Sequence, residues 1–268
     1  MNMTLELREP FLSLWQGKDP FVEVERLQGR IYRAMPGRRT LRTEIDGRAY
    51  FVKIHHGVGW LEIGKNLITG KPPVLGARQE WLALRRLRAA KVPTMTAVAF
   101  GERGKNPARR QSFLITEEIA PAIDLETLTQ NWQTTPPVPA RKYALIAAVG
   151  KTVAAMHQAG VNHRDCYLCH FLLREGEAHC PPSPALIDLH RAQVRAATPR
   201  RWRDKDLAAL WFSALNIGLT RRDKLRFLRA YFDKPLHAIL REEAGLLIWL
   251  EKKAARLMAR FQKYEGKL

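Results

Sequence analysis

One short segment holds most of the side chains in this sequence that can do chemistry. Residues 163–170 read His-Arg-Asp-Cys-Tyr-Leu-Cys-His. From the left, His-Arg-Asp followed by four residues and a metal-capable side chain has the spacing of a kinase catalytic loop. From the right, Cys166-x-x-Cys169-His170 has the spacing of a c-type haem attachment site. Because Cys180 follows closely, a zinc site is a third interpretation of the same side chains.

Composition and charge limit the classes of partner. The chain has 268 residues, of which 46% are hydrophobic, and this is ordinary for a globular protein with a sizeable core. It carries 45 basic and 26 acidic residues, which gives a formal net charge of +19. A field of that sign attracts phosphates, anionic membranes, nucleic acids or acidic proteins. A merely soluble basic surface is the alternative interpretation of the same charge.

We expect the chain to be cytoplasmic, because it has no run of about 20 apolar residues that would span a membrane. Residues 1–6 also lack the basic and apolar regions of a signal peptide. Three cysteines in a chain that is not exported do not indicate a disulfide framework. This location disfavours the haem interpretation, and we expect Cys166, Cys169 and Cys180 to be thiols of the core rather than zinc ligands.

The part of the chain before residue 120 has the pattern of an antiparallel sheet. Asp46-Gly47 is a strong signal for a tight turn between two alternating segments. Segment 55–76 is rich in Gly and Pro, and we expect it to pack on its own domain, with an interfacial membrane segment as the alternative. The elements predicted here are helices over residues 20–33 and 77–90 and strands over residues 39–45, 50–54, 95–101 and 112–119.

The part after residue 120 is mainly helical. Its predicted elements are helices over residues 124–130, 141–159 and 204–263, the last broken near Gly218 and Pro235, and strands at 171–173 and 186–187. The whole pattern predicts an α+β, protein-kinase-like fold of two lobes with the nucleotide between them. The N-lobe, residues 1–119, would bind the nucleotide phosphates. It would consist of a small antiparallel sheet with one helix, and would include the N-terminal helix. The C-lobe, residues 120–268, would carry the catalytic loop, the metal ligand and the substrate-binding helices.

Phosphoryl transfer needs positive charge around the phosphates and a base at the acceptor hydroxyl. In the kinase interpretation Asp165 is the catalytic residue that accepts or orients the hydroxyl proton. Lys53 would hold the α- and β-phosphates of ATP, and Glu80 would fix Lys53 through an ion pair. The backbone of the hinge, Glu117-Glu118-Ile119, would hold the adenine. Each residue alone is usually an ordinary surface or core residue, so the prediction depends on their order and spacing.

Two departures from the protein-kinase pattern concern the metal and the phosphates. Asp188 is the expected principal Mg²⁺ ligand, but Leu and His follow it instead of Phe and Gly. His170 stands where protein kinases have an asparagine that binds a second Mg²⁺, although Mg²⁺ prefers oxygen ligands to imidazole. No glycine-rich loop precedes Lys53, so we expect Arg38, Arg39 or Arg42 to supply charge at the phosphates.

Several longer stretches closely resemble the lipopolysaccharide core heptose(I) kinases of Gram-negative bacteria. They are spread over almost the whole chain and include His170 and the sequence Asp188-Leu189-His190. The two departures therefore look like features of that family and need not mean an inactive kinase. The stretches that carry the resemblance are residues 9–11, 17–21, 163–172, 187–193 and 199–207, together with Trp15.

The resemblance implies ATP-dependent phosphorylation, assisted by Mg²⁺, of the first heptose of the lipopolysaccharide inner core, with O-4 as the acceptor. The substrate would be an immature core glycolipid at the cytoplasmic face of the inner membrane. Its phosphates and carboxylates suit a chain of net charge +19. Our candidates for binding these anionic groups follow Asp188 in the sequence: Arg191, Arg195, Arg200, Arg201 and Arg203.

Several alternatives stay open on the sequence alone. The set of Lys53, Glu80, Asp165 and Asp188 does not separate this sugar kinase from a protein kinase or from a small-molecule kinase of the aminoglycoside or choline type. An inactive kinase fold is disfavoured because the set is complete. We expect no nucleic-acid partner, since no nucleic-acid motif is present. The charge permits an acidic partner such as acyl carrier protein, and peripheral contact with the anionic inner membrane through segment 55–76 or the basic last helix.

Overall fold

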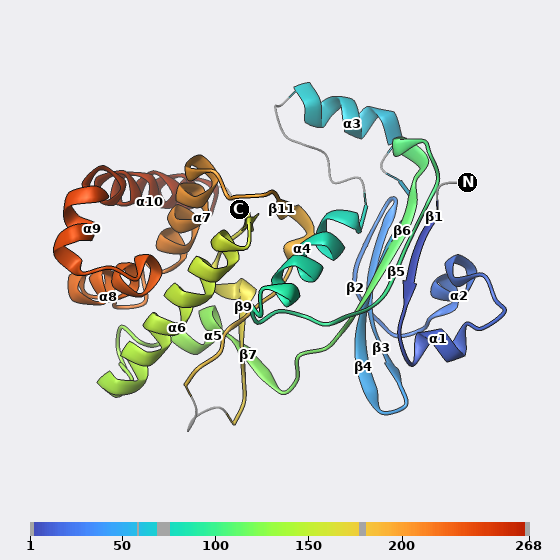
Figure 1. The fold of residues 1–268 in the computed structure, drawn as a ribbon, viewed down its shortest axis with the longest axis horizontal. Coiled ribbons are helices and arrows are strands. Elements are labelled where there is room, and N and C mark those ends of the chain that lie inside the picture. The colour runs from blue at the N-terminus through green and yellow to red at the C-terminus, as the bar shows by residue number, and fades with distance from the viewer. Residues whose placement is uncertain (1–2, 58, 69–75, 177–180, 266–268) are drawn as a thin grey trace. The chain divides into compact units, whose positions relative to one another are not determined.

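The computed structural model describes residues 3–57, 59–68, 76–176 and 181–265 (Figure 1). The chain forms two compact units. Unit 1 consists of Met1–Arg85 and Met95–Glu118, and unit 2 of Arg86–Thr94 and Ile119–Leu268. Unit 1 is built on an antiparallel sheet and unit 2 is mainly helical, which confirms the α+β class expected from the sequence.

Unit 1 contains a six-stranded sheet in the order β1-β5-β6-β4-β3-β2, with every neighbouring pair antiparallel. Besides the two helices predicted at residues 20–33 and 77–90, two further helices lie within its described residues. The strands are β1 (Met3–Leu7), β2 (Arg30–Met35), β3 (Arg38–Ile45), β4 (Arg48–His55), β5 (Ala97–Arg103) and β6 (Gln111–Glu117). The helices are α1 (Phe11–Leu14), α2 (Pro20–Arg26), α3 (Gly59–Ile68) and α4 (Arg78–Ala89).

One face of this sheet carries an aromatic core. Phe11 and Trp15 from the α1 region and Phe21 from α2 pack on it, and the rings of Trp15 and Phe21 both meet Phe113 of β6 edge to face. Side chains alternate between the two faces of a strand, so Val52 and its alternating neighbours in β4 point into this core. The same alternation directs Lys53 to the opposite face of the sheet.

The opposite face is covered by the first turns of α4. Trp81 of α4 stacks on Phe100 of β5, with ring centroids 4.2 Å apart and planes 9° from parallel. Glu80 precedes Trp81 and is almost fully buried. The helix is therefore held by an apolar stack at the position that brings its carboxylate to the face of the sheet that carries Lys53.

Two predictions for the start of unit 1 were wrong. The helix that begins at Pro20 ends at Arg26 instead of running to Arg33, because residues 30–35 pair with β3 as strand β2. Gly29 at the bend allows this approach, since a Cβ there would lie 2.0 Å from the carbonyl oxygen of Arg42. Strand β1 was not predicted, because its sequence has no strong local pattern. It is a strand because it pairs with β5.

Unit 2 packs its helices in pairs, α6 against α8 and α7 against α10 (Figure 1). Short strands form two small sheets, β10-β9-β7 and β11-β8. The helices are α5 (Leu125–Thr129), α6 (Pro139–Gln158), α7 (Arg200–Ser213), α8 (Arg221–Phe232), α9 (Leu236–Glu242) and α10 (Ala244–Glu265). The strands are β7 (Ala122–Asp124), β8 (Val161–Asn162), β9 (Phe171–Arg174), β10 (Ala185–Leu186) and β11 (Gln193–Val194).

The helices at the end of the chain differ from the prediction in two places. Helix α7 begins at Arg200, directly after Pro199, and not at Asp204. The last predicted helix is two helices, because the chain leaves helical geometry at Glu243 between α9 and α10. None of the described helices is long and apolar enough to cross a membrane.

Gly160 turns the chain from α6 into the segment that carries His163 and Asp165. Its φ is +78°, a conformation that strains residues with a side chain. A Cβ at this position would also lie 2.1 Å from the carbonyl oxygen of Arg195. The glycine thus allows the end of α6 and the segment after β11 to approach closely, and the Gly160 carbonyl accepts a hydrogen bond from the Arg195 amide at 2.9 Å.

Candidate active site

In unit 1, Lys53 of β4 and Glu80 of α4 form an ion pair. The Lys53 Nζ lies 2.7 Å from Oε1 and 3.0 Å from Oε2 of Glu80, so it donates to both carboxylate oxygens. The Glu80 side chain is only 1% exposed and that of Lys53 13%. A buried carboxylate without its partner is strongly destabilising, so each residue fixes the other. The arrangement presents one ammonium group at a defined place on the sheet, as phosphate binding requires.

The hinge residues are also fixed within unit 1. The Glu118 carboxylate pairs with the Arg42 guanidinium, with Nη2 to Oε2 at 2.7 Å, and this partner raises the pKa of Arg42. The amide of Glu117 donates to the Thr96 carbonyl and that of Glu118 to the Ala49 carbonyl. Adenine contacts to this hinge would therefore use backbone carbonyls or Ile119. Arg42 is already engaged, which makes it a weaker candidate for binding phosphate.

In unit 2, the segment that contains Asp165 is anchored by the buried carboxylate of Asp206 on α7. Its Oδ2 accepts a hydrogen bond from the His163 amide at 2.6 Å, and its Oδ1 accepts one from the Arg164 amide at 2.8 Å. Hydrogen bonds to a charged acceptor are stronger than those between neutral groups. Arg164 has a φ of +73°, an unusual value for a residue with a side chain. The two bonds from Asp206 hold the backbone in that conformation.

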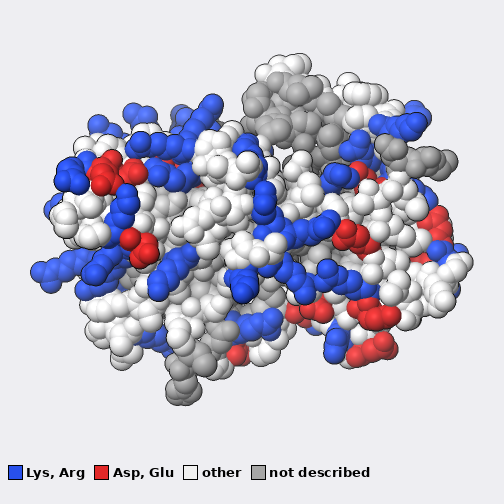
Figure 2. All heavy atoms as spheres, viewed as in Figure 1, with Lys and Arg blue, Asp and Glu red and all other residues white. Residues whose placement is uncertain are grey.

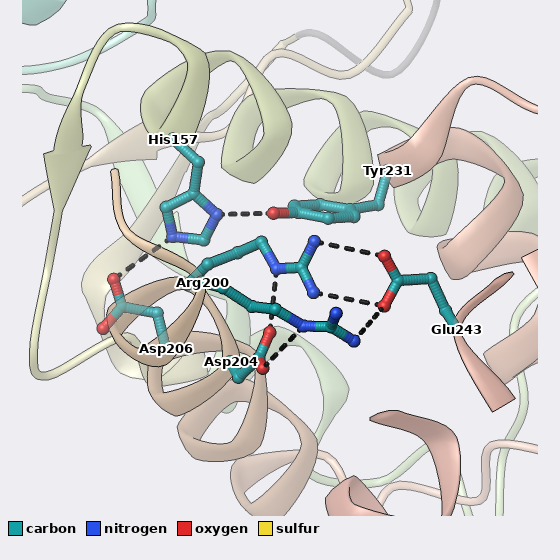
Figure 3. A network of polar contacts seen from close by, with 7 residues as sticks. His157, Arg200, Asp204, Asp206, Tyr231 and Glu243 are labelled. Atoms are coloured by element: carbon teal, nitrogen blue, oxygen red, sulfur yellow. Dashed lines mark hydrogen bonds and ion pairs between the residues drawn. The ribbon is translucent and has the colours of Figure 1, made fainter. Parts of the chain in front are cut away.

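A second layer of side chains holds Asp206 in turn (Figure 3). His157 of α6 places Nε2 3.3 Å from Oδ2 of Asp206 and Nδ1 2.7 Å from the hydroxyl of Tyr231 on α8. Since the carboxylate can only accept, Nε2 carries a proton and donates to it. Three helices are thereby connected to the segment of Asp165 through one row of polar contacts.

The His163 ring is fully buried and serves the backbone. Its Nε2 lies 3.0 Å from the carbonyl oxygen of Ile187, which can only accept, so Nε2 carries the proton. Burial lowers the pKa of His163, although the Asp206 carboxylate acts in the opposite direction. The neutral ring therefore links the segment of Asp165 to the segment of Asp188.

Asp165 and His170 lie together at the end of this loop. The Asp165 carboxylate accepts a hydrogen bond from Arg191, with Oδ1 to Nη1 at 2.6 Å. The backbone carbonyl of Asp165 lies 2.6 Å from Nδ1 of His170, which must donate to it. The Nε2 of His170 lies on the other side of the ring, whose plane is 4° from that of His163 with 5.5 Å between the ring centroids.

Asp188 faces Nε2 of His170. Its Oδ2 lies 3.9 Å from this nitrogen, and its Oδ1 accepts a hydrogen bond from Nδ1 of His190 at 2.8 Å. Asp188 has φ 55° and ψ 52°, a left-handed conformation that is sparsely populated by non-glycine residues and concentrated at functional sites. A carboxylate and an imidazole at this separation are side chains that can both ligate one cation. The residues present are thus compatible with a divalent metal, with Asp188 as its oxygen ligand.

Cys166 is a buried free thiol and Cys169 a half-buried one, as expected for thiols of the core. Burial raises the pKa of Cys166 well above that of a free thiol, and burial raises the pKa of Cys169 to about 11. Cys180 lies outside the described residues. Within the parts of the chain that the structure describes, no group of three or more His, Cys, Asp or Glu side chains is arranged to hold a metal ion.

Comparisons with known proteins agree over the full length of the chain. The model of the lipopolysaccharide kinase (Kdo/WaaP) family matches residues 22–231. The chain belongs to this family. It is 64% identical, over 98% of each chain, to the lipopolysaccharide core heptose(I) kinase WaaP of Pseudomonas aeruginosa. The same enzyme of Escherichia coli K12 is 50% identical over 97% of this chain and 98% of its own length.

A solved structure supports the fold assignment independently. WaaP in complex with acyl carrier protein matches with a TM-score of 0.85 and 59% sequence identity, over 95% of this chain and 99% of that chain. The resemblance seen in the sequence is therefore confirmed, and the fold is the kinase-like α+β fold of the Kdo/WaaP family.

The arginines predicted to bind substrate have different surroundings in this member of the Kdo/WaaP family. Arg191 pairs with Asp165, and Arg195 donates to the uncharged side chains of Asn162 and Gln193. Arg203 and Arg200 both pair with Glu243 (Figure 3).

Arg203 is little available for a ligand. It is 18% exposed and also bonded to Asp204. Burial alone would lower the pKa of Arg203, but its bonds to Glu243 and Asp204 raise it. Its guanidinium therefore holds α7 to the junction between α9 and α10.

Asp206 was not among the residues predicted from the sequence. It is one of two aspartates in Asp204-Lys205-Asp206, and nothing local distinguishes it from its neighbour. Only the fold brings Asp206 to the amides of His163 and Arg164, while Asp204 stays on the side of Arg203. The sequence around the His-Arg-Asp motif gives no hint of this contact, because more than 40 positions separate Asp206 from His163 and Arg164.

Asp206→Ala is expected to destabilise unit 2 by about 3 kcal/mol or more, because two amides, including the fully buried one of His163, lose their acceptor and each costs about 1–3 kcal/mol. Asp206→Asn, which keeps one acceptor oxygen, should lose less. Urea-induced unfolding followed by circular dichroism measures the change. Asp204→Ala on the same helix is the matched control, and it should cost about 1 kcal/mol or less. Equal losses for Asp206→Ala and Asp204→Ala would contradict the anchoring role.

Proposed function

We propose that this protein is a lipopolysaccharide core heptose(I) kinase, which transfers a phosphoryl group from ATP to the first heptose of the inner core. The observation that carries the proposal is the match along almost the full chain, at 64% and 50% identity, to two enzymes of that name. The geometry of both units supports it, because each holds side chains suited to one part of phosphoryl transfer.

Unit 1 would bind ATP. The Lys53 ammonium, held by both oxygens of Glu80, is placed to neutralise charge on the α- and β-phosphates. Fixing the ammonium before ATP binds removes the entropic cost of ordering a long lysine side chain. The hinge of Glu117, Glu118 and Ile119 stays our prediction for the adenine, and the Arg42–Glu118 pair fixes its conformation.

Unit 2 would act on the acceptor. In this proposal Asp165 accepts or orients the proton of the heptose hydroxyl, through Oδ2, while Arg191 holds Oδ1. The rigid loop fixes the carboxylate, since the hydroxyl oxygen has to attack along one direction. We assign the acceptor as O-4 of the heptose, from the family resemblance.

Mg²⁺ is the metal that we propose for Asp188 and His170. When bound it neutralises the developing charge on the phosphoryl group. Asp188 would supply the preferred oxygen ligand, and His170 would contribute Nε2, whose lone pair is directed by the hydrogen bond from Nδ1 to the Asp165 carbonyl. His190 orients the Asp188 carboxylate from the other side.

The decisive assay uses labelled ATP and a core glycolipid that lacks phosphate on its heptose. Wild type should transfer phosphate in the presence of Mg²⁺, and EDTA should abolish the transfer. Asp165→Ala should lower kcat by about 100-fold to 10,000-fold, the range for loss of a general base. Asp233→Asn, an exposed aspartate in a helix cap, should transfer like wild type. Mass spectrometry and NMR of the product locate the phosphate.

No transfer by wild type to this glycolipid, despite tight ATP binding, would overturn the assignment in favour of another acceptor. A product phosphorylated at a different hydroxyl would overturn only the choice of O-4. Transfer that survives EDTA would exclude the role proposed for Mg²⁺.

The glycolipid substrate places the reaction at a membrane, and we propose that α3 in unit 1 makes the peripheral contact with the cytoplasmic face of the inner membrane. Trp60 is 63% exposed, Leu61 93% and Ile68 90%. Large apolar side chains exposed together on one short helix are typical of membrane-surface helices. These exposures favour the interfacial alternative for segment 55–76 over packing on its own domain.

Leu61→Ser with Ile68→Ser should weaken binding to vesicles of phosphatidylethanolamine and phosphatidylglycerol by about 10-fold or more, since each apolar side chain buried is worth about 1.5–3 kcal/mol. Leu12→Ser with Leu14→Ser, on α1 of the same unit, is the matched control because both leucines are also exposed. Co-sedimentation measures the binding. Unchanged binding of the α3 variant would rule out α3 as the contact.

We also propose an acyl carrier protein as a partner. A structurally similar chain at 59% identity was solved with that partner, and the net charge of +19 complements an acidic protein. Purified acyl carrier protein should co-elute with this protein at low salt and less so at high salt, because screening weakens such attraction. An acidic protein of similar size and charge is the control. Equal co-elution of both acidic proteins would reduce the proposal to non-specific attraction.

A further inference from the structure

Four cationic side chains surround one indole ring in unit 2. The Lys205 Nζ lies 4.3 Å from the centroid of the Trp202 ring, and three guanidinium carbons lie 5.4 Å (Arg201), 5.7 Å (Arg195) and 5.9 Å (Arg164) from it. Cation–π attraction to an indole holds such groups in place without neutralising their charge. The arrangement therefore gathers positive charge in a small space.

These side chains come from two places in the chain. Arg201, Trp202 and Lys205 belong to the first turns of α7, where residues three apart lie on one face of the helix. Arg195 lies between β11 and α7, and Arg164 directly precedes Asp165. The cluster is thus built where the start of α7 and the catalytic loop meet. In Figure 2, further Lys and Arg side chains gather on the surface over α7 and α10.

The charge of this cluster is not balanced by the ion pairs that the described residues form nearby. Asp165 pairs with Arg191, and Glu243 pairs with Arg200 and Arg203. Asp206 is bonded to backbone amides, but its negative charge and that of Asp165 still act on Arg164. These two carboxylates, one of them already paired with Arg191, do not offset four cations. Arg195 is bonded to uncharged amide oxygens.

The cations at the start of α7 also lie unfavourably in the electric field of the helix dipole. The first turn of α7 carries no acidic residue, and positive side chains at a helix start oppose the helix dipole. Burial and the charges of Arg201, Lys253 and Arg164 lower the pKa of Lys205, which agrees with an excess of positive charge. Such an arrangement costs stability unless an anion joins it.

We propose that Arg164, Arg195, Arg201 and Lys205, arranged around Trp202, bind a phosphate monoester that the acceptor glycolipid already carries, and so position its heptose at Asp165. The inference rests on the proposed function. A phosphate monoester carries up to two negative charges and three terminal oxygens, which can accept from several donors at once, whereas one arginine satisfies a carboxylate. Arg164 connects the bound phosphate to Asp165, because the two residues are neighbours in the chain.

The double variant Arg201→Gln, Lys205→Gln removes two positive charges. Neither side chain makes a hydrogen bond or an ion pair within the described residues. Arg221→Gln with Arg222→Gln is the matched control, since it removes the same charge from exposed residues at the start of α8 in the same unit. Two glycolipids are compared, one with its lipid phosphate monoesters and one from which they have been removed. Equilibrium binding to detergent-solubilised glycolipid is measured without ATP, and KM is measured with it.

For the phosphorylated glycolipid, the Arg201–Lys205 variant should raise both the dissociation constant and KM by about 10-fold to 100-fold, as for loss of two charge-assisted contacts. The control should change them by about 2-fold or less, as expected for screened surface charges. Removing the phosphate should weaken binding to wild type by at least this factor. It should weaken the variant clearly less, since only Arg164 and Arg195 remain to bind the phosphate. That non-additivity identifies the phosphate as the group bound.

Three results would overturn the site. Equal losses for the two variants would mean general attraction of a basic protein. Additive losses from the variant and from phosphate removal would mean that the cluster binds another group. Loss of binding to phosphatidylglycerol vesicles, with no effect of phosphate removal, would assign the cluster to phospholipid headgroups. Phosphate-dependent binding without any transfer to heptose would instead retain the site and reject the proposed function.

Discussion

The buried carboxylate of Asp206 makes the contacts on which the segment of His163 and Asp165 depends. It accepts the amides of His163 and Arg164 and so holds a backbone conformation that a residue with a side chain rarely adopts. A charged acceptor is needed because the bonds have to outweigh both the strain and the cost of burying the charge. His157 and Tyr231 extend this contact to α6 and α8. The loop is therefore held by side chains of three helices, α6, α7 and α8.

In unit 1 a positively charged group is held in place by a buried negatively charged one. The Lys53 ammonium is held by a glutamate that is almost completely buried, and the helix that carries Glu80 is fixed by the stack of Trp81 on Phe100. In both units a charged group is fixed by contacts made before any substrate arrives. Preorganised charge is worth more in phosphoryl transfer than charge that has to be ordered during the reaction, because little covalent chemistry is left for the protein to do.

The excess of positive charge is divided between two kinds of side chain. Some arginines hold the fold, as Arg203 does by joining α7 to Glu243, and Arg42 does by joining β3 to Glu118. Others, such as Arg201 and Lys205, lie around an indole and form no ion pair within the described residues. The exposed apolar residues of α3 add a separate feature in unit 1. A substrate with anionic groups and acyl chains presents complementary chemistry to both features.

The sequence by itself determined the fold class and the order of the main elements, and it left the chemistry of the His163–His170 segment as a prediction. Those features are local, since alternation, turn signals and motif spacing act over a few residues. It did not reveal β1 or β2, because an edge strand depends on pairing with a neighbour that is distant in sequence. The break at Glu243 was missed for the same kind of reason, as it accompanies contacts to arginines of α7.

The division of roles among similar side chains was decided only by the tertiary structure. Asp204 and Asp206 are two residues apart, yet one pairs with an arginine near the surface and the other anchors the catalytic loop. Arg201 and Arg203 are equally close, yet one lies over Trp202 and the other is bonded to Glu243. Neighbouring residues on a helix point in different directions, so their roles depend on what packs on each side. That information comes from segments far away in the chain, and no local pattern contains it.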